Sequence, residues 1–167
     1  MKKAIVMAAA ILFTAGISAF ASGKNPIVTS VKEISYQMSF DKIVVEDDID
    51  LVLQENTNRL LSITGDEADI QKLEWKIKRN VLYIKSKGGS LKNKVTVKIS
   101  VNQLKEIFID GESALTSAGY LESPKLSVLV EGDGYVALKN AGSIYVQNGA
   151  STHFEVKKSV GDVVIGR

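Results

Sequence analysis

The chain of 167 residues contains no cysteine, one histidine and two prolines. The lack of cysteine excludes a disulfide framework, a thiol nucleophile, a thiolate metal site and a lipid-anchored cysteine. A catalytic triad would have to use His153, which the alternation of residues 151–154 turns outward, and a zinc site needs three or four suitable ligands. We therefore expect no catalytic residue, no metal site and no cofactor, and the chain is not expected to be an enzyme.

An excess of charge of one sign is also missing. The formal net charge is +2, and removal of Lys2 and Lys3 with an export signal lowers the 21 basic residues to the number of acidic ones, 19. Nucleic-acid binding and electrostatic binding to anionic lipid both need clustered basic residues. The composition therefore predicts no nucleic-acid partner.

Residues 1–21 have the order of a signal peptide: two lysines, an apolar run from Ala4 to Phe20, and the small-x-small site Ala19-Phe20-Ala21. Cleavage after Ala21 makes Ser22 the first mature residue and leaves no membrane span. We expect an exported protein of the periplasm, the extracellular space or the cell surface.

The remaining 146 residues fit one domain, which we place at residues 39–167 after an N-terminal segment, residues 22–38. Apolar and polar residues alternate almost throughout, most clearly in Val95–Val101, which predicts half-buried strands. Trp75–Ile84 predicts a hairpin that turns at Asn80. The one helical candidate is two turns at most and starts after Asp66 as N-cap. The fold class is all-β.

The last third of the chain repeats a short β-branched strand that is followed by glycine. The glycines at 111, 132, 149 and 166 are 21, 17 and 17 residues apart. A period near 20 favours a short right-handed parallel β-helix, or β-solenoid, behind an antiparallel N-terminal portion. A β-sandwich is the competing interpretation.

The strands also resemble a known family. Residues 40–45, 49–53 and 61–63 are similar to the opening of the head GIN domain of autotransporter adhesins, and the later strands and the Gly-Ala/Ser corners continue the match to about residue 166. The resemblance implies an exported bacterial domain, found mostly in Gram-negative bacteria, with a parallel β-helix-like fold and an adhesin-like role.

Acidic residues gather in two places. Glu46, Asp47, Asp48 and Asp50 have the charge of a calcium loop but lack its glycine bend, so a solvated turn is the preferred interpretation. A second set is expected at matching corners of adjacent coils and leaves a polysaccharide hydrolase or lyase as a weaker alternative: Asp110, Glu112, Glu131 and Asp133.

Two sets of residues are candidates for binding. Tyr120, Tyr135 and Tyr145 could stack on sugars. Phe108, Leu129, Tyr145 and Val164 are expected to point outward in one column, between inward pairs that run from Ile107 and Ile109 to Val163 and Ile165. Such a stripe needs a cover, which residues 24–38, a second copy or an external ligand could supply.

The function that we expect is a non-catalytic binding module of the cell envelope or surface. Its partner would be a surface glycan or an envelope protein. A structural protein that self-assembles into a homo-oligomer is the first alternative.

Overall fold

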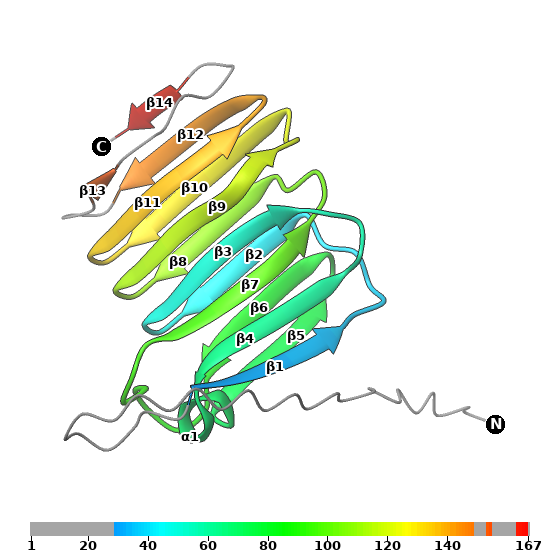
Figure 1. Ribbon diagram of the computed structural model, residues 1–167. Helices are drawn as coiled ribbons and strands as arrows, with labels where there is room; N and C mark the ends of the chain where they lie inside the picture. The colour runs from blue at the N-terminus through cyan, green and yellow to red at the C-terminus, as the bar shows by residue number, and fades with distance from the viewer. Residues whose placement is uncertain (1–28, 149–152, 155–162, 167) are drawn as a thin grey trace, which may run out of the picture.

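The computed structural model describes residues 29–148, 153–154 and 163–166 and is almost entirely β-structure (Figure 1). The elements in chain order are β1 (Thr29–Ser35), β2 (Lys42–Glu46), β3 (Ile49–Glu55), β4 (Leu60–Asp66), α1 (Glu67–Ile70), β5 (Leu73–Lys78), β6 (Val81–Ser86), β7 (Val95–Val101), β8 (Glu106–Asp110), β9 (Ser113–Leu121), β10 (Lys125–Glu131), β11 (Gly134–Asn140), β12 (Ser143–Asn148), β13 (His153–Phe154) and β14 (Val163–Gly166). The expected all-β class is confirmed. Within these residues no helix is long and apolar enough to span a bilayer.

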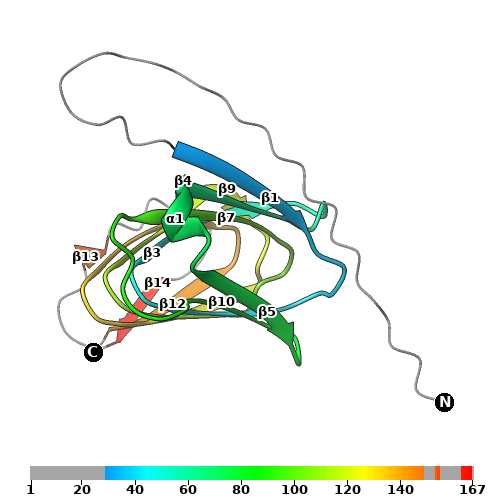
Figure 2. The ribbon, with the colours of Figure 1, turned by 90° about the horizontal axis from the view of Figure 1, so that it is seen from below.

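The strands form two seven-stranded sheets that face each other (Figure 2). Sheet A has the order β1-β4-β7-β3-β9-β11-β13, and sheet B has the order β14-β12-β10-β8-β2-β6-β5. From β8 to β14 the chain passes from one sheet to the other at every corner, so each strand pairs in parallel with the strand two positions later.

The period of 2 in the sequence explains how the sheets enclose a core. In β2 and β8, Ile43, Val45, Ile107 and Ile109 are fully buried, and the residues between them are partly exposed. Branched apolar side chains fit this pleated, half-buried surface. The inner faces are therefore continuous apolar ladders across the paired strands.

The N-terminal portion is mixed, whereas the sequence predicted an antiparallel one. β1–β4, β4–β7 and β5–β6 are antiparallel, but β2–β6 and β3–β7 are parallel. The difference arises because β2 and β3 also pair with β8 and β9 of the repetitive part and share their direction. β1, from the segment expected before the domain, lies at the edge of sheet A.

Two local predictions are confirmed. The β5–β6 hairpin turns at Arg79 and Asn80, which both have positive φ, as the tight hairpin turn requires. Asp66 is the N-cap of α1, and its carboxylate accepts a hydrogen bond from Ala68 N at 2.9 Å.

The expected inward pairs are buried in β8, β10 and β12, but not at the end of the chain. Ile165 in β14 is 54% exposed, because β14 is the last strand of sheet B and has a neighbour on one side only. The side chain of Val163 lies outside the described residues, as does the predicted signal peptide.

Candidate functional site

The outer face of sheet B is the most distinctive surface of the described chain. The strand registers place Lys76, Tyr83, Val44, Phe108, Leu129 and Gln147 opposite one another, one from each strand from β5 to β12. We name this set the central row. Four of its members, Tyr83, Val44, Phe108 and Leu129, are half-buried apolar or aromatic side chains.

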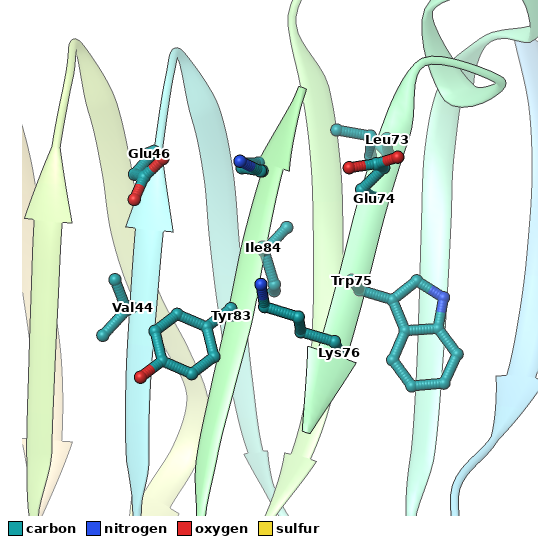
Figure 3. Close-up of a pocket in the computed structure, with 9 residues that line it drawn as sticks. Val44, Glu46, Leu73, Glu74, Trp75, Lys76, Tyr83 and Ile84 are labelled. Atoms are coloured by element: carbon teal, nitrogen blue, oxygen red, sulfur yellow. The ribbon is translucent and has the colours of Figure 1, made fainter. Parts of the chain in front are cut away.

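A groove of about 510 Å³ opens at the β5 end of the central row (Figure 3). We name it the sheet-B groove. Strands β2, β5 and β6 position its lining, which consists of Val44, Glu46, Leu73, Glu74, Trp75, Lys76, Tyr83, Ile84 and Lys85. Tyr83 lies beside Val44, and the indole of Trp75 projects beyond β5, away from Tyr83 (Figure 3).

Charged groups surround the aromatic lining of the sheet-B groove. The Lys76 ammonium lies 5.4 Å from the centre of the Tyr83 ring, within cation–π range. Glu74 pairs with Lys87 at 3.4 Å. Lys85 forms no ion pair with a carboxylate of the described residues, so it is a cation available to a ligand. The groove thus combines an aromatic face with donors and acceptors.

The predicted apolar column does not form as one row. Leu129 pairs with Phe108, as expected, but it lies opposite Gln147, whereas Tyr145 lies opposite Ser127 and Val164. The corner before β12 fixes this register, since Ser143 N donates to the Pro124 carbonyl at 3.1 Å. Only glycine fits at position 142, because a Cβ atom there would clash with the Pro124 carbonyl oxygen at 2.2 Å.

The four predicted surface residues differ in exposure. Phe108 and Leu129 are half-buried, Tyr145 is 36% exposed and Val164 is 47% exposed. Residues 29–38 do not cover them, because β1 is in sheet A, on the opposite side of the core. The hypothesis that this part of the N-terminal segment covers the apolar column is therefore wrong.

The three candidate sugar-stacking tyrosines lie on two sheets. Tyr120 and Tyr135 belong to β9 and β11 of sheet A, and Tyr145 belongs to β12 of sheet B. The ammonium of Lys125 lies 4.6 Å from the Tyr145 ring. The structure does not bring the three rings to one surface. His153, in β13, pairs with Tyr135.

The acidic turn between β2 and β3 is tied to neighbouring strands. Asp48 accepts a hydrogen bond from Glu112 N at 2.9 Å, Asp50 accepts one from Ala114 N at 2.9 Å, and Asp47 accepts one from Ser86 N at 2.8 Å. These carboxylates satisfy backbone donors on adjacent strands. Calcium is therefore not needed to explain why the acids gather here.

The second acidic set lines an open hollow of about 530 Å³ at the corner after β8 and β10: Asp110, Glu112, Glu131 and Asp133. Asp48 of the first set also lines this hollow. Asp110 and Glu131 are direct neighbours across the two strands, as the sequence predicted. Nowhere in the described ranges do three or more His, Asp or Glu side chains meet in a group that could hold a metal ion.

Asp69 is the buried carboxylate of the described chain, 1% exposed. It accepts hydrogen bonds from Lys72 Nζ at 2.8 Å, from Lys92 N at 3.1 Å, and from Asn93 N and Nδ2 at 2.9 and 3.1 Å. The bond with Lys72 is the main cause that lowers the pKa of Asp69, against the opposing effect of burial. Asp69 holds the loop of residues 87–94 against α1, and its four hydrogen bonds leave no lone pair directed at a ligand.

Sequence reasoning missed Trp75, Tyr83 and the lysines around them as a site. One signal was present. Between residues 72 and 98 the chain has nine basic residues and one acid, Glu74. The net charge of the whole chain does not reveal this basic segment, because the segment from 106 to 133 is acidic.

The chain belongs to the family described as "Putative auto-transporter adhesin, head GIN domain", whose model matches residues 39–166. The expected family membership is confirmed. No curated protein matches the chain.

Solved structures with similarity to the chain include a "putative adhesin" from Parabacteroides merdae, with 14% identity, a TM-score of 0.49, and coverage of 83% of this chain and 96% of that one. A "putative adhesin" from Parabacteroides distasonis has 15% identity, a TM-score of 0.47, and coverage of 82% and 96%. A "putative lipid binding protein" from the same species has 16% identity, a TM-score of 0.46, and coverage of 76% and 60%.

Proposed function

We propose that the chain is an exported, non-catalytic binding module that binds a surface glycan through the sheet-B groove. In this proposal the two sheets form a short right-handed β-solenoid, and the module works in the periplasm or at the cell surface. The predicted signal peptide and the family of adhesins support the location. The observation that carries the ligand class is the groove itself.

The groove fits carbohydrate for a physical reason. A sugar ring offers a face of C–H groups and a rim of hydroxyls, so it needs a flat apolar surface beside polar groups. Tyr83 and Val44 supply the surface, while Glu46, Glu74, Lys76 and Lys85 supply acceptors and donors. Because the lining comes from paired strands, little order must be gained on binding.

A non-catalytic role fits the carboxylates of the groove. Hydrolysis of a glycoside needs a carboxylic acid that donates a proton, and enzymes usually hold this group in an apolar, desolvated setting. Glu46 and Glu74 are exposed, and Glu74 pairs with Lys87. Exposed carboxylates of this kind suit hydrogen bonding to a ligand better than proton transfer to it.

A glycan array with the purified protein tests this proposal. Tyr83→Ala should weaken binding to the captured glycans about tenfold, since one aromatic face is lost. Tyr120→Ala is the matched control, because it removes an exposed tyrosine from sheet A. Unchanged thermal midpoints establish that both variants are folded. Glycan binding that survives Tyr83→Ala but not Tyr120→Ala would move the site to sheet A, and an array without any signal would refute the ligand class.

A further inference from the structure

The free edge of sheet B is a strand whose sequence is complementary to itself. β5 is the last strand of this sheet and pairs with β6 on one side only. No described strand lies beyond it (Figure 2). Every second residue of such a strand turns its N–H and C=O groups toward the open side, where another strand can bind.

We propose that β5 is the contact of a symmetric homodimer, in which β5 of one copy pairs antiparallel with β5 of a second copy around Trp75. A two-fold axis perpendicular to the sheet must pair residues that point to the same face. With Trp75 at the axis, Glu74 lies opposite Lys76 of the second copy, and Leu73 lies opposite Ile77. Each of these pairs occurs twice.

The charges favour this register over the two that are centred on its neighbours, Glu74 and Lys76. An axis at Glu74 or at Lys76 would place two like charges directly opposite each other, which is unfavourable. In the register at Trp75, Lys72 lies opposite Lys78 of the second copy, but Lys72 is neutralised by the buried Asp69 at 2.8 Å. The contact of Glu74 with Lys87 is longer, 3.4 Å, and joins two exposed side chains, so Glu74 can also pair with Lys76 of the second copy. Unlike charges and apolar side chains then match at every other position.

The other free strand provides a contrast. β1 is the edge of sheet A, and its two central charged residues are Lys32 and Glu33. Adjacent residues point to opposite faces, so no two-fold axis perpendicular to the sheet can place Lys32 opposite Glu33 of a second copy. β1 therefore lacks the charge complementarity that β5 has.

β5 also lacks three of the features that protect edge strands from pairing, namely a proline, a bulge and an inward-pointing charge. It contains no proline, no bulge interrupts its six pairs with β6, and its charged residues all point to the outer face. Leu73, Trp75 and Ile77 point to the inner face and are only half-buried, because β5 lies at the margin of the core. Pairing with a second copy would cover them further.

Such a dimer would join the two B sheets and place two sheet-B grooves side by side on one outer face. Two linked sites bind a repetitive ligand more tightly than one, since the second contact forms within the same complex. The dimer itself does not depend on the glycan proposal, and its tests use no ligand.

Sedimentation of the purified protein over a wide range of concentration should show a monomer–dimer equilibrium. Glu74→Lys and Lys76→Glu each place like charges opposite each other twice, so each should raise the dimer dissociation constant about tenfold. The double variant with both changes should restore it, and a mixture of the two single variants should form a heterodimer. Lys98→Glu, an exposed change on sheet A, is the control.

Cross-linking tests the register directly, because the chain has no cysteine of its own. Directly opposed residues have Cα atoms about 4.5–5.5 Å apart, within disulfide range. Glu74→Cys mixed with Lys76→Cys should give a covalent dimer on oxidation, whereas either variant alone, and Lys98→Cys, should not. A monomer at all concentrations, a double variant that is not restored, or equal cross-linking of Lys98→Cys would each overturn the proposal.

Discussion

The replacement Asp69→Asn tests how much one buried carboxylate contributes to the fold. In the structure, each carboxylate oxygen accepts two hydrogen bonds: Oδ1 from Lys72 and Lys92, and Oδ2 from Asn93 N and Nδ2. An amide keeps one oxygen and turns its NH₂ group toward two donors. About two charge-assisted hydrogen bonds are then lost, each with a net contribution of about 1.5 kcal/mol.

We therefore expect Asp69→Asn to lower the free energy of unfolding by about 3 kcal/mol at pH 7, and the thermal midpoint by about 10 °C. Urea unfolding followed by tryptophan fluorescence measures it, since Trp75 is the only tryptophan of the chain. Asp66→Asn is the matched control because asparagine caps a helix as well as aspartate does. It should change the stability by less than about 0.5 kcal/mol.

The pH dependence gives a second measurement of the same residue. A carboxyl group whose pKa is lowered by folding contributes its full stabilisation above its unfolded pKa of about 3.9, and loses it as the pH falls below that value. The pKa of Asp69 is lowered, so the difference between the parent and Asp69→Asn should shrink below about pH 4. A variant within 0.5 kcal/mol of the parent at pH 7 would refute the assignment of Asp69 as the anchor of the loop of residues 87–94.

Two further predictions concern the core. Val130→Ala should cost roughly 2–3 kcal/mol in urea unfolding because Val130 is fully buried, whereas Ser127→Ala, at an exposed position, should stay within about 0.5 kcal/mol. Burial raises the pKa of Tyr36 to about 12, against the opposing effect of Arg59, so the unfolded chain loses this proton first as the pH rises. Stability should therefore fall by up to about 2 kcal/mol between pH 10 and 12, and Tyr36→Phe should remove that part of the fall; equal slopes for both proteins would contradict it.

The sequence was sufficient to predict strands, the β5–β6 hairpin and the cap of α1, because these features depend on neighbours in the chain. Alternation of apolar residues in β7 and positive φ at Arg79 and Asn80 are local properties. The same reasoning failed for Tyr145 and Leu129, which were expected in one column. Their register is decided by a backbone hydrogen bond between Ser143 and Pro124, which no local pattern encodes.

The sheet-B groove could not be predicted because the β5–β6 hairpin supplies only part of its lining, and the rest comes from β2, far away in the chain. Val44 in β2 becomes a neighbour of Tyr83 only because β2 pairs in parallel with β6. The predicted tyrosines, by contrast, were chosen by residue type alone, and the structure distributes them over two sheets. Aromatic content thus identified the kind of group that could bind a sugar, while topology decides which of the rings share a surface.

The pattern in β5 shows why topology must come before charge in such arguments. The order Leu73-Glu74-Trp75-Lys76-Ile77 is present in the sequence, and in a central strand it would describe only alternating faces. This self-complementary order can act between two copies because β5 is the edge of sheet B, where the second side of the strand is open. The two charges of β1 have no such consequence, since Lys32 and Glu33 are adjacent and point to opposite faces. The spacing of two between Glu74 and Lys76, at a free edge, is the combination that permits two copies to pair.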